Sequence, residues 1–324
     1  MKIFVTRKIP QAGLDLLREK HEIEVFPHDR IPTKQEIING LRGKDGLLCL
    51  LTDPIDKEVI YSEPKLKTIA SYAVGYNNID VKAATERGVS VSNTPDVLTD
   101  TTAEMAWALL FSVARRIVEG DTFTREGKFK GWAPMLMLGQ DVSNKTLGII
   151  GAGRIGAAFA LKSKGFNMNV LYADEKQNEI LERELGAKKV SFDELIKKSD
   201  YISIHVPLTP STKHLIGEKE LQAMKKNTIL INTSRGPVIN EKSLIKALKE
   251  KWIFGAGLDV YENEPKIEKE LLKLDNAVLQ PHSASATTET RTKMAIMAAE
   301  NMIAGLNGKI PPNCVNIEVF NKKL

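Results

Sequence analysis

Short apolar runs alternate with amphipathic stretches along the first part of the chain. Runs rich in β-branched and other apolar residues predict strands, and they lie at residues 2–6, 21–27, 45–52, 66–74 and 89–93. Between them, the stretches 11–20 and 34–42 place apolar residues at helical spacing. Because alternating strands and helices build a parallel sheet covered by helices, we predict a first βαβ unit here.

The same alternation returns after residue 145. Further strands are predicted at 146–152, 168–174, 188–192, 201–208, 227–234, 255–260 and 277–282. A last helix is expected over 287–306, and the tail at 311–320 then has no strand left to pair with in the second sheet. We therefore expect the tail to return to the first unit. The fold class is α/β, with two Rossmann-like, doubly wound parallel-sheet domains, the outer one flavodoxin-like and discontinuous.

One long helix is predicted between the two series, within residues 94–127. Asp100 or Thr101 can cap it, and Glu104 lies in its first turn. Its apolar positions surround more than one stripe, so we expect it to pack on two sides. Such a helix suits a domain connector or a subunit interface.

Composition narrows the class of protein. With 324 residues the chain is too long for one ordinary core, and its 42% hydrophobic and 27% charged residues are typical of a globular protein. No apolar run has the length of a membrane span, and residues 1–10 lack the apolar core of a signal peptide, so we expect a cytoplasmic protein.

Charge and cysteine content exclude further classes. Cys49 and Cys314 are too few for a disulfide framework, and their neighbours have no metal-ligand spacing, so no metal is expected. The net charge of +5 is spread along the chain, which indicates a solvated surface. A positive net charge also favours anionic substrates through long-range attraction. No basic block with interleaved aromatic residues indicates a nucleic-acid partner.

A glycine-rich turn follows the first strand of the second series. Gly151, Gly153 and Gly156 have the spacing G-x-G-x-x-G, after an apolar run and before an alanine-rich helix. In a dinucleotide site the first glycine allows the turn, the second lets the backbone approach a pyrophosphate, and the third lets helix and strand pack closely. Arg154 and Ile155 would supply amides to the pyrophosphate at the helix N-terminus.

An acidic residue about twenty positions further on supports this interpretation. Asp174 ends the next predicted strand, where a carboxylate accepts hydrogen bonds from ribose hydroxyls and repels a 2′-phosphate. The sequence therefore predicts NAD rather than NADP, although Lys176 lies nearby.

Three later strand ends carry the side chains that reduction of a carbonyl requires. Arg235 follows one strand, Asp259 and Glu264 follow the next, and His282 follows the last. Arginine binds a carboxylate with two hydrogen bonds, histidine can donate a proton, and a carboxylate can favour its protonated form. Since ligands bind at the carboxyl ends of strands in open α/β sheets, we expect these groups at one edge.

With these residues the chain resembles the D-isomer-specific 2-hydroxyacid dehydrogenases. The matching stretches, in the order of the family, are YAVGYNNID, NTPDVLTDTTAE, LGIIGAGRIG, VPLTPST, INTSRGPVI, GLDVYENEP and PHSASAT. The resemblance covers essentially the whole chain. It implies a substrate domain formed by residues 1–98 and 286–324, an NAD-binding Rossmann domain at 99–285, and a homodimer.

The resemblance also implies a role for each site residue. His282 would protonate the carbonyl of a 2-oxo acid as hydride arrives from the nicotinamide, and Glu264 would hydrogen-bond His282 and favour its charged form. Arg235, together with the backbone amides of Val74 and Gly75, would hold the substrate. The residues implied to contact the cofactor, besides the glycine turn and Asp174, are Asp259 at the carboxamide, Thr102, Val206, Pro207, Thr212, Thr233 and Ser285.

The substrate is less sharply indicated. The stretches at 73–80, 93–110 and 257–265 look most like the glyoxylate/hydroxypyruvate reductase branch, so we predict glyoxylate or hydroxypyruvate. Two departures from that branch are Leu136, where a second Trp is expected after Trp132, and the acidic Asp174, where a basic or small polar residue is frequent. D-3-phosphoglycerate dehydrogenase and D-lactate dehydrogenase remain alternatives, and an NAD-sensing binding protein like the C-terminal-binding co-repressors is the alternative from another class.

Overall fold

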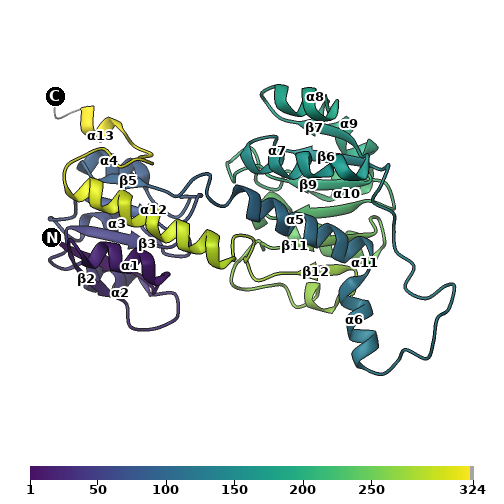
Figure 1. Cartoon of the computed structure of the whole chain (residues 1–324), viewed down its shortest axis with the longest axis horizontal. Helices are drawn as coiled ribbons and strands as arrows, with labels where there is room; N and C mark the ends of the chain where they lie inside the picture. The colour runs from purple at the N-terminus through teal and green to yellow at the C-terminus, as the bar shows by residue number, and fades with distance from the viewer. Residues whose placement is uncertain (322–324) are drawn as a thin grey trace. The chain divides into compact units, whose positions relative to one another are not determined.

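The computed structural model describes residues 1–321 and divides into two compact units. Unit 1 consists of Met1–Leu98 and Ala286–Leu324, and unit 2 of Thr99–Ser285. Figure 1 shows the elements of both units; in unit 1 the helix at Thr288–Leu306 packs against the helix at Gln11–Arg18. The prediction of two parallel-sheet α/β folds is confirmed.

Unit 1 is built on a five-stranded parallel sheet. The strand order is β2-β1-β3-β4-β5. The strands are β1 (Lys2–Val5), β2 (Glu22–Val25), β3 (Gly46–Cys49), β4 (Thr68–Ser71) and β5 (Ser90–Ser92). β3, β4 and β5 are buried throughout because helices cover both faces of the sheet.

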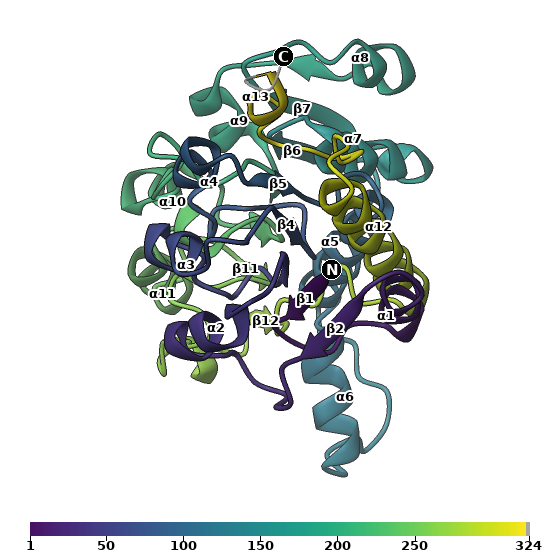
Figure 2. The same cartoon turned by 90° about the vertical axis from the view of Figure 1, so that its left-hand side faces the viewer.

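The helices of unit 1 form two layers (Figure 2). One layer holds α1 (Gln11–Arg18) and α12 (Thr288–Leu306), and the other holds α2 (Lys34–Leu41), α3 (Lys57–Tyr61) and α4 (Val81–Arg87). Local signals set their ends: Thr33 and Glu36 form a capping box at the start of α2, and Gly88, with φ of +76°, ends α4.

The C-terminal segment belongs to unit 1. The backbone of Gly13 in α1 lies directly against Ala295 of α12, where a side chain would not fit. After α12 the Val315 N–H donates to the Val91 carbonyl of β5 at 2.8 Å, and Cys314 forms an antiparallel bridge with Ser92. A short α13 (Glu318–Asn321) follows. The tail thus returns to the first sheet.

Unit 2 is built on a seven-stranded parallel sheet with the order β12-β11-β10-β9-β6-β7-β8. The strands are β6 (Thr146–Ile150), β7 (Asn169–Ala173), β8 (Lys188–Lys189), β9 (Tyr201–Ile204), β10 (Ile229–Asn232), β11 (Gly255–Leu258) and β12 (Ala277–Leu279). The chain starts at β6 and later returns to its other side with β9, so the order reverses there. Open α/β sheets bind ligands at such a reversal.

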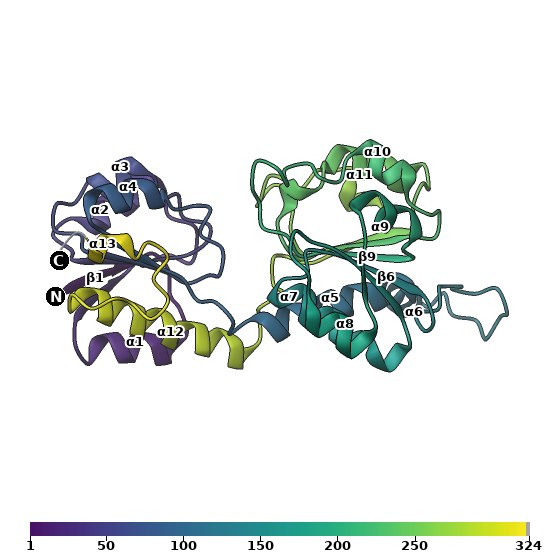
Figure 3. The ribbon, with the colours of Figure 1, turned by 90° about the horizontal axis from the view of Figure 1, so that it is seen from above.

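Helices cover both faces of this sheet (Figure 3). One face carries α5 (Thr99–Ala114), α7 (Arg154–Leu161) and α8 (Glu179–Leu185), and the other carries α9 (Phe192–Lys198), α10 (Glu218–Ala223) and α11 (Glu241–Lys249). Trp107 of α5 stacks on Phe159 of α7 with ring centroids 4.8 Å apart, and its indole N–H donates to the Phe159 carbonyl. α5 also packs against β10 and β11 of the sheet, so two sides of this helix are used within unit 2.

The single long helix expected within residues 94–127 is wrong, because the structure contains two. α5 ends at Ala114, and α6 (Ile117–Arg125) begins after Arg116, which has φ of +52°. The Ala114 carbonyl accepts the N–H of Gln140 at 2.7 Å, and the Arg116 guanidinium binds Glu119. The returning chain thus takes the carbonyl that a further helical turn would need.

Within residues 1–321, none of the helices combines the length and the apolar character that crossing a bilayer requires.

Candidate active site

The glycine turn joins β6 to α7 at the carboxyl edge of the second sheet. Gly151 has φ of +91°, and a Cβ on it would lie 2.8 Å from the Val206 side chain. A Cβ on Gly156 would lie 2.0 Å from the Gly151 carbonyl oxygen. The structure thus gives both glycines the steric reasons that the sequence predicts, a tight turn and close helix packing.

Gly153 is different, because no atom of residues 1–321 outside its own turn lies within 4 Å of a Cβ built there. It is the N-cap of α7, has an ordinary φ of −71°, and provides no side-chain cap. Nothing within the described chain therefore requires a glycine at this position. The empty space in front of the helix terminus fits a pyrophosphate group, which would accept the amides of Arg154 and Ile155.

Asp174 lies immediately after β7, beside this turn. Its two carboxylate oxygens accept the N–H groups of Ala152 at 2.7 Å and Lys176 at 3.0 Å. Each oxygen keeps a lone pair for a further donor. The carboxylate is thus fixed against the glycine turn by two backbone bonds.

The loops after β9 and β10 contain the other residues expected near the cofactor. The buried Thr233 hydroxyl has no hydrogen-bond partner in the structure, as expected for a group that a ligand satisfies. The Thr212 hydroxyl instead donates to the Pro207 carbonyl at 2.6 Å, so it shapes its own loop. Together with the space at Gly153, the orphaned Thr233 hydroxyl shows that these residues fit a dinucleotide.

His282 and Glu264 form a hydrogen-bonded pair across two strand ends. His282 Nδ1 lies 2.7 Å from Glu264 Oε2, and the two side chains keep 26% and 29% of their accessible surface. Glu264 Oε1 accepts the Tyr261 N–H at 2.9 Å. The carboxylate is therefore oriented toward the imidazole, while the Nε2 atom of His282 remains to face a ligand.

Asp259 and Arg235 lie on the neighbouring strand ends. Asp259 is completely buried, and its oxygens accept the N–H groups of Ser283 and Ala284 at 2.7 and 2.9 Å. These bonds attach the segment that carries His282 to the end of β11. The Arg235 guanidinium donates to the Ser234 carbonyl at 2.7 Å.

Electrostatics couple these groups. Burial alone would raise the pKa of Glu264, but the bond to His282, the charge of that imidazole, the Tyr261 N–H and the charge of Arg235 together lower it. Burial lowers the pKa of Arg235, and Glu264 opposes this effect. Burial raises the pKa of Asp259, although the two hydrogen bonds that it accepts from backbone N–H groups act to lower it. Glu264 is therefore an anion beside the His282 ring.

The remaining expected residues are dispersed. Thr102 is buried on α5, and Ser285 is partly exposed at the end of unit 2. Val74 and Gly75 belong to unit 1, in the loop after β4. The Val74 carbonyl accepts the Asn93 side-chain amide at 2.7 Å, which fixes the orientation of this loop.

Comparisons with known proteins agree with this geometry. A model of the NAD-binding domain of the D-isomer specific 2-hydroxyacid dehydrogenases matches residues 107–284. A glyoxylate reductase of Korarchaeum cryptofilum is 55% identical over 320 residues, which cover 98% of this chain and 96% of that protein. The chain belongs to the D-isomer-specific 2-hydroxyacid dehydrogenases.

Solved structures extend the likeness over the whole chain. The crystal structure of a protein from Thermus thermophilus has a TM-score of 0.92 and 43% identity, covering 97% of this chain and 100% of that one. An NADPH-dependent glyoxylate/hydroxypyruvate reductase from Sinorhizobium meliloti, in complex with citrate, has a TM-score of 0.85 and 30% identity, covering 97% of each chain. The predicted family is confirmed, and the Sinorhizobium meliloti relative is NADPH-dependent.

This dehydrogenase contains a second histidine–carboxylate pair, which sequence reasoning missed. His214 Nε2 lies 2.6 Å from Glu262 Oε1. Glu262 is two residues before Glu264 in the stretch ENEP, and this nearness was the one signal available. Nothing local in the sequence identifies His214 as its partner.

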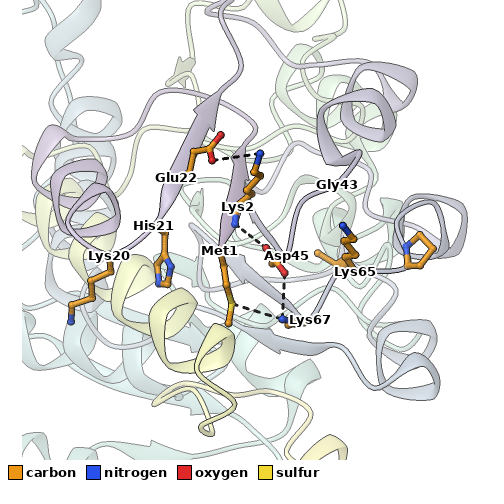
Figure 4. A pocket seen from close by; sticks show the side chains of 11 residues that line it. Met1, Lys2, Lys20, His21, Glu22, Gly43, Asp45, Lys65 and Lys67 are labelled. Atoms are coloured by element: carbon orange, nitrogen blue, oxygen red, sulfur yellow. Dashed lines mark hydrogen bonds and ion pairs between the residues drawn. The ribbon is translucent and has the colours of Figure 1, made fainter.

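A hollow of about 910 Å³ in unit 1 lies away from these residues (Figure 4). It is lined at the amino ends of the strands, where Lys2 pairs with Glu22 and Lys67 pairs with Asp45. None of the predicted site residues lines it.

Proposed function

We propose that this dehydrogenase reduces a small 2-oxo acid, glyoxylate or hydroxypyruvate, to the D-2-hydroxy acid with NADH. The observation that carries the proposal is the His282–Glu264 pair, at 2.7 Å, on the same strand edge as Arg235 and Asp259. A proton donor, its anionic partner and a cation for a carboxylate are the groups that carbonyl reduction needs. A bound nicotinamide would supply the hydride.

His282 would donate the proton. Because Nδ1 donates to the Glu264 carboxylate, the imidazolium presents its second proton on Nε2. Glu264 keeps the ring oriented and stabilises its positive charge until the carbonyl oxygen accepts the proton. The negative charge on Glu264, supported by its lowered pKa, makes this role possible at neutral pH.

Arg235 would bind the substrate carboxylate and carbonyl oxygens through its planar guanidinium. The amides of Val74 and Gly75 would add hydrogen bonds to the carboxylate. The Asn93 bond to the Val74 carbonyl supports this role, since it fixes the peptide groups of that loop. Asp259 would orient the nicotinamide carboxamide.

We propose NADH rather than NADPH as the working cofactor. Asp174 carries a negative charge where the adenosine ribose would lie, and its bonds to Ala152 and Lys176 prevent it from turning away. A 2′-phosphate would be repelled by it. Thr102, Val206, Pro207, Thr212, Thr233 and Ser285 would line the same cofactor.

The choice of a small 2-oxo acid rests on the glyoxylate reductase named among the relatives. Initial rates with NADH and NADPH over glyoxylate, hydroxypyruvate, pyruvate, phenylpyruvate and phosphohydroxypyruvate test it. We expect the highest kcat/KM for glyoxylate or hydroxypyruvate. A lead for phosphohydroxypyruvate or pyruvate would assign the enzyme to the D-3-phosphoglycerate or D-lactate branch, and no turnover on any acid would overturn the proposal.

We also propose that the enzyme is a cytoplasmic homodimer. Both cysteines are free thiols, which fits a reducing compartment. α6 and the loop after it, drawn in Figure 1 before the chain returns to β6, expose Ile117, Val118, Phe129, Trp132, Met135 and Leu138. Such a group of exposed apolar side chains favours a partner surface.

A further inference from the structure

Three loops of unit 2 are joined to one another by hydrogen bonds. They are residues 205–217, 233–240 and 259–270, and the last two carry Arg235 and Glu264. The His214 N–H donates to the Pro237 carbonyl at 2.8 Å, and Ile216 forms a parallel bridge with Ile239. The first loop is therefore attached by its backbone to the loop that carries Arg235.

The His214 side chain reaches the third loop. Its Nε2 atom lies 2.6 Å from Glu262 Oε1, and Glu262 Oε2 accepts the Glu241 N–H at 2.9 Å. In return, the Glu262 N–H donates to the Glu241 carboxylate at 2.9 Å. Glu262 is thus held from both sides, by His214 and by the start of α11.

The backbone at Tyr261 and Glu262 determines where Glu264 lies. The Tyr261 N–H donates to Glu264 Oε1, while Glu264 Oε2 binds His282. The loop of Arg235 touches the same backbone, because a Cβ on Gly236 would lie only 1.9 Å from the Tyr261 carbonyl atoms. A shift of this backbone would move the carboxylate that orients the acid and disturb the loop that positions Arg235.

We propose that His214 is a positioning residue that holds the Arg235 loop and the Glu264 loop in one fixed arrangement. Its backbone N–H binds the first of these loops and its imidazole N–H binds the second. His214 touches neither of the reacting groups, so it acts only through Glu262 and Pro237. The inference rests on the proposed 2-oxo acid reduction, because it concerns the residues assigned to that reaction.

The test compares His214→Ala with His214→Gln in the full-length protein. The amide nitrogen of Gln lies about as far along the side chain as Nε2 of His and can donate the same bond, whereas Ala cannot. We expect His214→Ala to lower kcat by about tenfold to a hundredfold, the scale of an angstrom-sized misplacement at a reacting centre. His214→Gln should restore most of the rate.

The pH profile separates positioning from a stabilising role. If Glu264 is displaced in His214→Ala, the His282 ring loses the carboxylate that it binds, so the pH profile of kcat/KM should differ from that of the wild type. Two other charged groups, Asp259 and Arg235, lie around His282, and both are unchanged in this variant. NADH affinity, measured by fluorescence titration, should change by less than about threefold, because His214→Ala keeps the backbone bond to Pro237 that holds the loop of Val206, Pro207 and Thr212.

A matched control is Thr228→Ala, which removes the bond from the buried Thr228 hydroxyl to the Ser199 carbonyl at the opposite end of β10. It should lower the melting temperature but leave the pH profile in place. If His214→Ala moves only the melting temperature, as the control does, the positioning role is wrong. If His214→Ala does not fold, His214→Asn replaces it, because the amide of Asn is one carbon too short to reach Glu262. A rate and pH profile of His214→Asn equal to those of His214→Gln would overturn the proposal.

The wild-type enzyme separates this inference from the proposed function. If the wild type reduces no 2-oxo acid, the proposed function fails and the inference fails with it. If the wild type is active and His214→Ala has its rate and pH profile, the positioning role alone fails.

Discussion

At the scale of the residue, two carboxylates, Asp259 and Glu264, fix the position of His282. His282 has φ of +54°, which non-glycine residues rarely adopt. The conformation persists because Asp259 accepts the next two N–H groups and Glu264 binds the ring. Strained residues of this kind concentrate where a side chain must point into a reaction site.

Replacement of His282 should separate binding from chemistry. His282→Ala removes the proton donor but none of the groups proposed to hold the dinucleotide. We expect kcat to fall by about two to four orders of magnitude, while NADH binding by fluorescence titration is retained. His28→Ala, which changes an exposed histidine of unit 1, is the control and should behave as wild type. Normal turnover by His282→Ala would place the acid elsewhere.

Replacement of Asp174 should change the choice of cofactor. Asp174→Asn keeps the size of the side chain but removes the charge that repels a 2′-phosphate. The ratio of kcat/KM with NADH to that with NADPH should fall by at least about tenfold, measured with saturating glyoxylate. An unchanged ratio would remove Asp174 from the account of specificity.

At the scale of the element, the turn from β6 to α7 depends on three glycines with separate physical reasons. Gly151 and Gly156 are required by contacts inside the chain, whereas the space beside Gly153 is open. The sequence spacing predicted the steric reasons for Gly151 and Gly156, because both arise within one strand–turn–helix segment, and the role of Gly153 at a pyrophosphate stays a prediction. The helix start offers its N–H groups toward the same open space.

Two alanine substitutions in this turn should therefore affect different properties, the stability of the protein for Gly156→Ala and the affinity for NADH for Gly153→Ala. Gly156→Ala places a methyl group against the Gly151 carbonyl and should lower the melting temperature by several degrees. Gly153→Ala meets no atom of the chain, so the melting temperature of the free protein should change little while NADH affinity falls by tenfold or more. Thermal unfolding and fluorescence titration check both. Equal NADH affinity in Gly153→Ala and wild type would argue against a pyrophosphate at that position.

At the scale of the whole molecule, carboxyl groups make the stability depend on pH. Nine described carboxyls have a lowered pKa, namely Glu36, Asp45, Asp56, Glu182, Glu184, Asp200, Glu262, Glu264 and Glu270. Asp53 and Asp259 have a raised pKa because of burial. A carboxyl group whose pKa is lowered in the folded state stabilises that state at pH values above its ordinary pKa. This stabilisation is lost as the pH falls through the lowered pKa.

We therefore expect the melting temperature to fall as the pH decreases below about 4, the ordinary range of these carboxyls. Asp53 and Asp259 act in the opposite direction but are outnumbered. Asp200→Asn removes one contributor, which binds Lys225 at 2.8 Å, and should make the fall shallower. Calorimetry between pH 7 and pH 3 checks both; a constant melting temperature over this range would contradict the assignment.

The proposed dimer is also a property of the whole molecule. Light scattering at micromolar concentration should give twice the mass of the 35.9 kDa chain. Ile117→Asp places a charge among the exposed apolar side chains of α6 and should shift the protein toward the monomer. Since α6 carries no predicted site residue, a monomeric wild type would overturn the dimer without affecting the proposed chemistry.

The sequence by itself determined the two α/β folds, the glycine turn and the strand ends that carry Arg235, Asp259, Glu264 and His282. These features are local: apolar periodicity defines each strand, and polar residues that follow buried parallel strands come to one edge of the sheet. For the same reason the family could be identified from short stretches in a fixed order.

Only the tertiary structure decided where α5 stops and what holds the Glu264 loop. Gln140 binds the carbonyl of Ala114, and His214 binds Glu262, although both pairs are far apart in the chain. Such bonds depend on which loops meet after the sheet has formed, and they leave no periodic pattern in the residues around them. The end of a helix and the orientation of the Glu264 carboxylate were therefore set by long-range contacts.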